Sequence, residues 1–455
     1  MMVTLPARYG RWVPILIPLA LITLFLHLNA GFGDTAQVIL EPASFQNANE
    51  IEAPPIEESS PSCRQLPGIE DILVVVKTGI TEAQHKVPVH IRTTLRCIPN
   101  KLVVSDFEED IEGLRTVDVF RNVSQALYSN NDFALYNRAR RGGRAALTNQ
   151  DHTKVTNSAA GMMDNPGWKL DKWKFLPMIQ EARAYRPDAK WYVFLEADTY
   201  PIWPNLLAWL DNFNSNRKWY LGNQMMIGEN TFAHGGSGFV ISNAAMHAVA
   251  DFHAARRDEW DEITDREWAG DCVLGMAFAK AGIGLTWSWP HFTTESVWEQ
   301  DALGKGLSTP QWCYPSLTFH HMTPADVNQM WQFEQDWFSN ENRTVLTYGD
   351  IFRHFIRPML TSHADNWDNN APDGDNNEFY LGPSTPASTY ECAEYCARSS
   401  DCIQYRIDER GRCSTSGWAL RGLPKPGVVS GTMLWRVDAA IKQRGKCRQP
   451  MWVTK

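Results

Sequence analysis

The chain has 455 residues, of which 44 % are hydrophobic and 21 % charged, and its formal net charge is −9. This length exceeds one ordinary domain, and the composition suits a globular protein with a large core. The negative net charge argues against nonspecific binding to nucleic acid, whose phosphates attract basic surfaces.

The first patterned segment is the apolar run 13–32. It contains no Asp, Glu, Lys or Arg, and Arg8 and Arg11 lie just before it. The run just reaches the length of about 20 residues that crosses a bilayer, and the basic flank predicts a cytoplasmic N-terminus. We therefore expect a cytoplasmic tail over 1–12 and an uncleaved signal anchor over 13–32. A cleaved signal peptide is the alternative, and either one places the rest of the chain in the secretory pathway.

Residues 33–66 are acidic, rich in Pro and Ser, and lack hydrophobic periodicity, which predicts a flexible stem. Nine cysteines in an oxidising compartment should mostly pair, and the odd number leaves one over. Sequons at Asn122 and Asn342 are typical of surface loops in secreted chains, although each is weak evidence alone.

From residue 67 to 360, short apolar runs alternate with helical patterns. The runs are "DILVVVKTG", "KLVVSD" and "WYVFLEAD". This alternation predicts an α/β fold, with a mainly parallel sheet flanked by helices. Ligands of such sheets bind at the carboxyl ends of the strands. The three runs end in polar groups there, which include Thr78, Asp106, Glu196 and Asp198.

Glu196 and Asp198 form the most distinctive of these strand ends. Alternation along an extended strand would put both carboxylates on one side, where they repel unless a cation lies between them. A hard divalent ion such as Mn²⁺ or Mg²⁺ would relieve this repulsion and could hold a diphosphate leaving group. The alternative is a solvated strand end or a helix-capping Asp, because Glu-x-Asp is common by chance.

Three later segments carry further candidates. Gly235, Gly236 and Gly238 precede the apolar run "FVIS", where they permit close approach of a substrate or simply a tight turn. Asp271 precedes an amphipathic helix and is either a functional acid or its N-cap. His320 follows an apolar patch and is either a metal ligand or a structural histidine.

The C-terminal quarter differs in composition. Residues 361–386 are rich in Asn, Asp and Pro, which predicts a linker. The following segment, 387–450, has four closely spaced cysteines, which predict a small disulfide-supported module: Cys392, Cys396, Cys402 and Cys413. Four cysteines allow three pairings, and their spacing alone does not choose among them.

The order of these segments resembles the fringe-like glycosyltransferases of family 31, most closely the core 1 β3-galactosyltransferase branch. The resemblance runs from about residue 69 to about residue 355, and it is specific as an ordered set rather than motif by motif. It implies a GT-A fold, a UDP-sugar donor, Mn²⁺, and inverting transfer that forms β1,3 linkages to a glycan or glycoprotein acceptor.

The resemblance also implies roles for the acidic and histidine residues. Asp198 matches the last Asp of the family's Asp-rich motif, which is a metal ligand, and His320 in "TFH" matches the second ligand, with His321 the weaker choice. Glu196 occupies the first acidic place, where the family commonly has Asp, and would contact the donor. Asp271 matches the proposed general base.

The remaining roles concern substrate binding. The segment "GGSGF" resembles the family's acceptor loop, so Gly235, Gly236 and Ser237 are expected to contact the acceptor. Thr78 and Asp106 are candidates for uridine contacts. Lys172, in the helix before the acidic strand, is the candidate that approaches the diphosphate.

The four-cysteine module resembles a PAN/Apple domain, which implies binding of protein or carbohydrate. Of the three possible pairings we expect the nested one, 392–413 with 396–402, although neither the spacing nor the resemblance selects it. Together these features predict a type II membrane glycosyltransferase of the Golgi or another secretory-pathway membrane, with its catalytic domain in the lumen. The alternative is a noncatalytic carbohydrate- or protein-binding membrane protein on the same scaffold.

Overall fold

The computed structural model describes residues 66–151, 165–304, 310–340, 342–371 and 388–454. The expected tail and anchor, and all but the last residue of the expected stem, lie outside this part of the chain. Across the described ranges, no helix is both long and apolar enough to cross a membrane.

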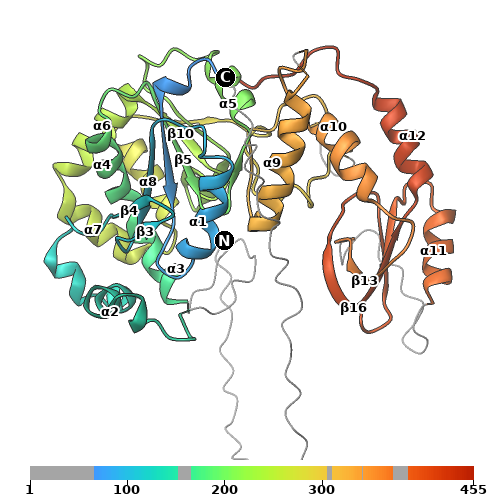
Figure 1. The fold of residues 1–455 in the computed structure, drawn as a ribbon, viewed down its shortest axis with the longest axis horizontal. Coiled ribbons are helices and arrows are strands. Elements are labelled where there is room, and N and C mark those ends of the chain that lie inside the picture. The colour runs from blue at the N-terminus through green and yellow to red at the C-terminus, as the bar shows by residue number, and fades with distance from the viewer. Residues whose placement is uncertain (1–65, 152–164, 305–309, 341, 372–387, 455) are drawn as a thin grey trace, which may run out of the picture. The chain divides into compact units, whose positions relative to one another are not determined.

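An eight-stranded mixed sheet organises the N-terminal two-thirds of the described chain, in the order β11-β7-β10-β5-β1-β2-β4-β3 (Figure 1). The pairs β1–β2, β1–β5, β2–β4 and β7–β11 are parallel, whereas β10 is antiparallel to both of its neighbours. The predicted α/β class with a mainly parallel sheet is thus confirmed. The strands are β1 (Ile72–Lys77), β2 (Lys101–Ser105), β3 (Asp110–Ile111), β4 (Leu114–Asp118), β5 (Trp191–Glu196), β7 (Tyr220–Gly222), β10 (Phe239–Ser242) and β11 (Leu285–Trp287).

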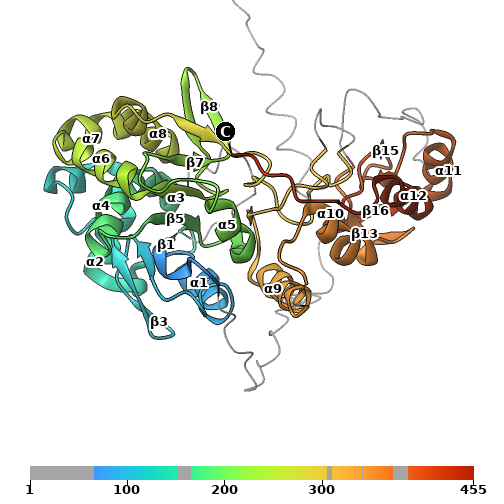
Figure 2. The same ribbon diagram turned by 90° about the horizontal axis from the view of Figure 1, so that it is seen from above.

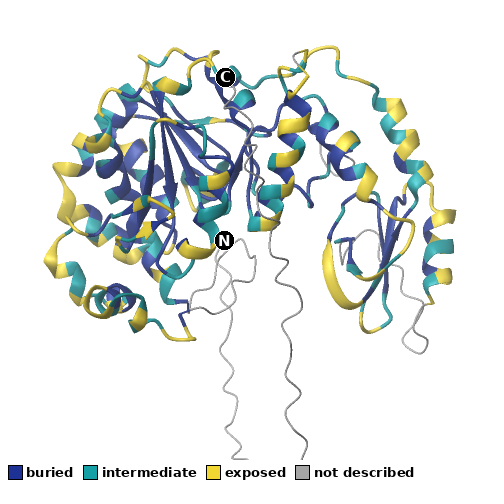
Figure 3. Ribbon diagram, viewed as in Figure 1, coloured by how far each residue is buried: buried dark blue, intermediate teal, exposed yellow. Residues whose placement is uncertain are grey.

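The central strands β1 and β5 are the apolar runs of the sequence. Every residue of β1 is buried, as expected for a strand covered on both faces (Figure 3). In the parallel register, Val75 lies opposite Phe194 and Lys77 lies opposite Glu196. The carboxyl ends of these strands therefore meet at one edge of the sheet, and their polar terminal residues become neighbours.

Helices cover both faces of the sheet (Figure 2). On one face, Tyr192 and Phe194 pack with residues of α4 (Phe175–Tyr185), α6 (Asn243–Ala254) and α8 (Gly270–Lys280). On the other face, Val193 and Leu195 pack with residues of α1 (Ala83–Arg92) and α5 (Trp203–Leu210). Successive side chains of β5 point to opposite faces of the sheet, so they contribute to two separate hydrophobic cores. Further helices in this part are α2 (Ala134–Gly142), α3 (Pro166–Asp171) and α7 (Arg257–Arg266).

A third core lies beside the sheet. The short strand β12 (Thr318–Phe319) pairs antiparallel with β6 (Tyr200–Pro201), which follows β5. This pairing brings the segment just after β12 to the end of β5, although His320 lies 124 positions after Glu196 along the chain. Helices α9 (Pro324–Phe338) and α10 (Tyr348–Ile351) complete this core. Elsewhere in the chain, β8 (Gln224–Ile227) and β9 (Asn230–Ala233) form a hairpin. The glycine-rich loop, which contains Gly235, Gly236 and Gly238, follows this hairpin.

The C-terminal part contains a four-stranded antiparallel sheet in the order β13-β16-β14-β15. Its elements are β13 (Ala364–Asp368), α11 (Thr389–Arg398), β14 (Gln404–Ile407), β15 (Cys413–Ser416), β16 (Leu423–Thr432) and α12 (Leu434–Arg444). The linker predicted over 361–386 is wrong for residues 364–368, which form β13. Asp365 and Asn366 of this polar strand are exposed, and the buried Asp368 is compensated by ion pairs with Arg406, at 3.0 Å, and Lys425, at 3.1 Å.

The disulfides confirm the expected nested pairing. Cys392 bonds Cys413, and Cys396 bonds Cys402, so the four cysteines pair among themselves. The third described disulfide, Cys313–Cys447, links the third core to the C-terminal tail. Cys97 is also disulfide-bonded, and the described free cysteine is the buried Cys272.

Candidate active site

The end of β1 and the end of β5 form a buried charge cluster. Nζ of Lys77 lies 2.5 Å from Asp171 and 3.2 Å from Glu196, so this lysine is shared by two carboxylates. Burial raises the pKa of Glu196, and the nearby Asp171 adds to the effect, although Lys77 opposes it. Glu196 is therefore a carboxyl group with a raised affinity for a proton, held by a lysine from the adjacent strand.

Asp198 has different partners. Its Oδ2 lies 3.0 Å from Nζ of Lys86, and its Oδ1 lies 3.4 Å from Nε2 of His320. Burial alone would raise the pKa of Asp198, but His320 and Lys86 outweigh it and hold the pKa well below its usual range.

The expectation that Glu196 and Asp198 extend side by side from one strand is therefore corrected. β5 ends at Glu196, and the chain turns there, because the N–H of Thr199 donates to the carbonyl of Glu196 at 3.0 Å. Side chains alternate between the two faces of a sheet only within a strand, so this alternation does not extend to Asp198. Each carboxylate instead forms an ion pair with a different lysine: Glu196 with Lys77, and Asp198 with Lys86.

Asp198, His320 and His321 could hold a metal ion. One potential ligand atom from each lies within 4.8 Å of the others. Nδ1 of His320 is buried and has no hydrogen-bond partner in the described chain, and the buried Oδ1 of Asp198 has only its 3.4 Å ion-pair contact with Nε2 of His320; an incompletely satisfied buried polar group is costly unless a ligand completes it. Two imidazoles and a carboxylate suit a divalent transition metal, so the residues present fit a divalent metal ion.

The backbone at His321 explains why two successive histidines reach one site. His321 has φ of 55°, a left-handed conformation that is uncommon outside glycine. The two rings stack with centroids 3.8 Å apart. Burial lowers the pKa of His321 to about 4, and the neighbouring His320 adds to this, so His321 is neutral and able to bind a metal. We expected His320 as the ligand, with His321 the weaker choice, but the structure brings both histidines to Asp198.

The glycine-rich loop packs directly on this group. A Cβ atom on Gly236 would overlap the ring of His320, so the position has no room for a side chain. Thr199 donates to the carbonyl of Gly236, and Thr318 donates to that of Ser237, each at 2.7 Å. The loop is thus tied to both the β5 end and the β12 strand. Ser237 is buried, and its hydroxyl lies 2.8 Å from Nδ1 of His234.

Asp271 lies on the other side of the same loop. It is the second residue of α8 rather than its N-cap, which is Ala269. Its carboxylate accepts hydrogen bonds from the N–H groups of Gly235 and Cys272, each at 2.9 Å. Burial raises the pKa of Asp271 to about 6; the Glu196 carboxylate adds to this, and the two N–H groups oppose it. This carboxylate is oriented by the loop and ionised at neutral pH.

The expected donor contacts Thr78 and Asp106 lie together at the ends of β1 and β2. Oδ1 of Asp106 accepts from the N–H of Ile80 at 2.7 Å. Lys174 lies 3.2 Å from Oδ2 of Asp106 and donates to the carbonyl of Thr78 at 2.8 Å. The hydroxyl of Thr78 is buried without a hydrogen-bond partner among the described residues, so it is available to a ligand.

Lys172 is not among these groups. Its ammonium lies 3.0 Å from Asp132 and donates to the carbonyl of Asp265. The lysines that do contact the acidic strand ends are Lys77, Lys86 and Lys174. Lys77 could have been predicted as a site residue, because it ends a buried strand. No feature of the sequence indicated that Lys86, which lies in α1, contacts Asp198.

The comparisons with known proteins agree with this arrangement. A family model described as Fringe-like matches residues 68–330, which is more than half of the chain. The matched range contains β1, β5, the glycine-rich loop, Asp271 and both histidines. The search of curated proteins finds no match.

Proposed function

The chain belongs to the Fringe-like family, and on that premise we propose that it is a metal-dependent, inverting glycosyltransferase. The family indicates glycosyltransferase activity in general. We propose that the donor is a UDP-hexose or UDP-N-acetylhexosamine, that the acceptor is a hydroxyl of a glycan or glycoprotein, and that the product linkage is β1,3.

One observation carries this proposal: a single glycine loop contacts both reactive groups. Gly236 packs on the ring of His320, and the N–H of the adjacent Gly235 donates to Asp271. A donor held at the histidines and an acceptor held at Asp271 would therefore meet at this loop. Such fixed placement of two reactants lowers the barrier to transfer.

On the donor side, Asp198, His320 and His321 are the residues that would hold Mn²⁺, which would supply positive charge to the leaving UDP. Lys86 adds a positive charge of the chain itself beside Asp198. Lys77 keeps Glu196 in place at the strand end. The free hydroxyl of Thr78 and the buried Asp106 are the proposed contacts of the nucleoside.

On the acceptor side, Asp271 acts as the general base. Its ionised carboxylate takes the proton of an acceptor hydroxyl while the hydroxyl oxygen forms a bond to the anomeric carbon of the donor. The bond from that carbon to the UDP oxygen breaks, and UDP leaves with the electron pair. Attack from the face opposite UDP inverts the configuration.

We also propose that the enzyme is a single-pass type II protein of the Golgi or a related membrane, with a PAN/Apple-like module at its C-terminus. The basic flank before the apolar run 13–32 supports the topology. The sequon residues Asn122 and Asn342 are both exposed, as glycosylation requires. In cells, the protein should keep its N-terminus and gain a glycan at one of these sites. A secreted form that begins near Asp34 would contradict the anchor.

The test of the activity is a donor screen. The purified protein is incubated with each common UDP-sugar, with and without Mn²⁺, and the release of UDP is measured. One donor should give release that requires both the metal and Asp271. Binding of sugars without metal-dependent UDP release would instead favour the noncatalytic carbohydrate-binding alternative.

A further inference from the structure

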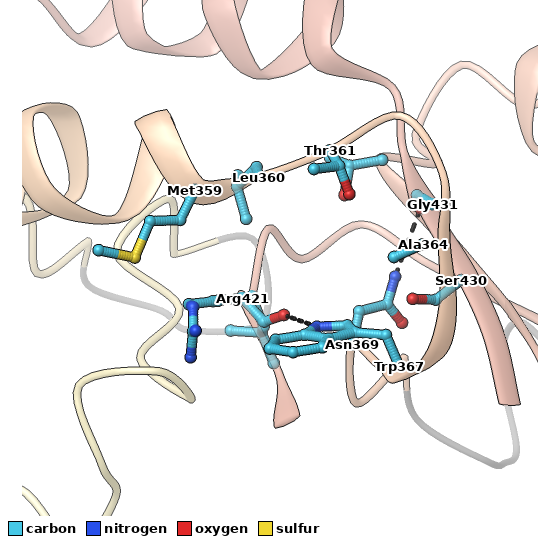
Figure 4. Close-up of a pocket in the computed structure, with 11 residues that line it drawn as sticks. Met359, Leu360, Thr361, Ala364, Trp367, Asn369, Arg421, Ser430 and Gly431 are labelled. Carbon is cyan, nitrogen blue, oxygen red and sulfur yellow. Dashed lines mark hydrogen bonds between the residues drawn. The ribbon is translucent and has the colours of Figure 1, made fainter. Parts of the chain in front are cut away.

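A pocket of about 180 Å³ lies in the C-terminal part of the chain, outside the family match. Met359, Leu360 and Thr361 lie on one side of it, and Arg421 and Trp367 lie on the opposite side (Figure 4). Residues of β13 and β16 complete the wall. None of the residues assigned to donor, metal or acceptor lines this pocket, so the active site does not account for it.

Arg421 is the charged residue in the pocket wall, and its guanidinium packs on two tryptophan rings. The carbon of its guanidinium lies 4.2 Å from the ring centroid of Trp298 and 4.9 Å from that of Trp367. Within the described ranges, the guanidinium donates no hydrogen bond to another residue, although it offers five N–H donors. A half-buried guanidinium with free donors is suited to a carboxylate, which it binds with two parallel hydrogen bonds.

The backbone of Arg421 is clamped in place. Its N–H donates to the carbonyl of Trp298 at 3.2 Å, and its own carbonyl accepts from the indole N–H of Trp367 at 2.6 Å. The same two tryptophans therefore hold both the main chain and the side chain. A donor group fixed in this way loses little conformational entropy when a ligand binds.

The rest of the wall combines hydroxyl and apolar groups. Thr361, Ser430 and Thr432 contribute hydroxyls that make no hydrogen bond to another described residue. Leu360, Leu420 and the indole of Trp367 contribute apolar surface. Free hydroxyls beside an aromatic face match the two kinds of surface on a sugar ring, which presents hydroxyls at its edge and C–H groups on its faces.

We propose that this pocket binds one acidic sugar residue, a hexose ring that carries a carboxylate, within a glycan. The volume suits a single ring rather than an enclosed oligosaccharide. Arg421 binds the carboxylate, the hydroxyls of Thr361 and Ser430 bind ring hydroxyls, and Trp367 packs on the ring. This site goes beyond the proposed function, because it holds a glycan independently of sugar transfer.

The experiment measures binding to the full chain by calorimetry, with a trisaccharide of galacturonic acid and the neutral galactose trisaccharide as probes. The acidic trisaccharide should bind at least about tenfold more tightly, in line with the strength of a charge-assisted bidentate pair. Arg421→Gln should remove this preference. Thr361→Val, a milder change, should weaken both probes by several-fold and leave the preference intact.

Two controls make the result decisive. Inorganic sulfate should compete only weakly, because it lacks a ring for Trp367 and the hydroxyls. UDP release with a small neutral acceptor should be unchanged in Arg421→Gln, since this residue is outside the active site. Equal affinity for the two trisaccharides, or a preference that survives in folded Arg421→Gln, would overturn the proposal. Because binding is measured without donor, failure of the transferase assignment would not affect this test.

Discussion

Nζ of Lys86 lies 3.0 Å from Oδ2 of Asp198, so the carboxylate best placed to bind a metal already has a cation from the chain beside it. Lys86 also lies 2.7 Å from Glu82, which is the N-cap residue of α1, four residues earlier. A metal ion that takes Asp198 must therefore displace Lys86 or share the carboxylate with it, and Glu82 provides the lysine with a second partner.

Lys86→Met tests this competition. Removing the ammonium leaves Asp198 without its nearest positive charge, so Mn²⁺ should bind about tenfold more tightly, which corresponds to roughly 1.4 kcal/mol for a partly buried charge pair. Calorimetric titration of Mn²⁺ alone checks this prediction. Glu82→Gln is the matched control, and it should weaken metal binding slightly, because Lys86 then depends on Asp198 alone. Weaker binding in Lys86→Met would show that the lysine supports the metal instead.

Asp198→Asn should abolish both UDP-sugar turnover and the Mn²⁺ dependence of UDP binding, because the amide keeps the size of the side chain but loses its charge. Without metal, this variant should also be less stable to unfolding, by about 1 kcal/mol after allowance for partial exposure of the pair, since Lys86 and His320 lose their anion. Turnover assays and urea unfolding check the two effects. Unchanged Mn²⁺-dependent UDP binding would leave Asp198 as a structural ion-pair partner.

His320→Ala and His321→Ala should each lower the affinity for Mn²⁺, because ligand atoms of both lie within 4.8 Å of Asp198. We expect the larger loss, about 10- to 100-fold, for His320, whose ring is also buried against Gly236. Calorimetry of Mn²⁺ binding ranks the two variants. His234→Ala serves as the comparison, because its ring lies 5.4 Å from that of His320 but it is not part of the candidate metal group.

The pH dependence of transfer should report Asp271. Its pKa is raised to about 6 by burial, and the base must be ionised to accept a proton. Transfer should therefore be constant above about pH 7 and fall about tenfold per pH unit below pH 6. A profile of kcat/KM against pH checks this expectation. Asp271→Asn should bind UDP and Mn²⁺ as before and lose transfer, whereas a fall that begins only below pH 4 would assign the base to another group.

Gly236→Ala should lower both the stability of the protein and its affinity for Mn²⁺, through a steric overlap and without any change of charge. The new methyl group would overlap the His320 ring, and moving that ring costs about 1–3 kcal/mol of stability as an overpacked position. Weaker Mn²⁺ binding should accompany the loss of stability. Gly284→Ala is the matched control, since no atom lies within 4 Å of its Cβ position, and it should leave the melting temperature and metal affinity unchanged.

The elements that depend on neighbouring residues could be predicted from the amino-acid sequence. The apolar runs that became β1 and β5 were visible because buried parallel strands need continuous hydrophobic residues. The close spacing of Cys392, Cys396, Cys402 and Cys413 predicted a disulfide-supported module, but it left three pairings open, of which the structure forms Cys392–Cys413 and Cys396–Cys402.

Which charged side chains contact each other could not be predicted from the sequence. Lys86 and Asp198 are 112 residues apart, and nothing local to α1 shows that its lysine faces the end of β5. The same holds for β13, a polar strand whose buried Asp368 is compensated by Arg406 and Lys425, and for His321, which reaches Asp198 through a left-handed backbone. Periodicity reports whether a side chain is buried, but the partner of a buried charge is set by chain packing between distant segments.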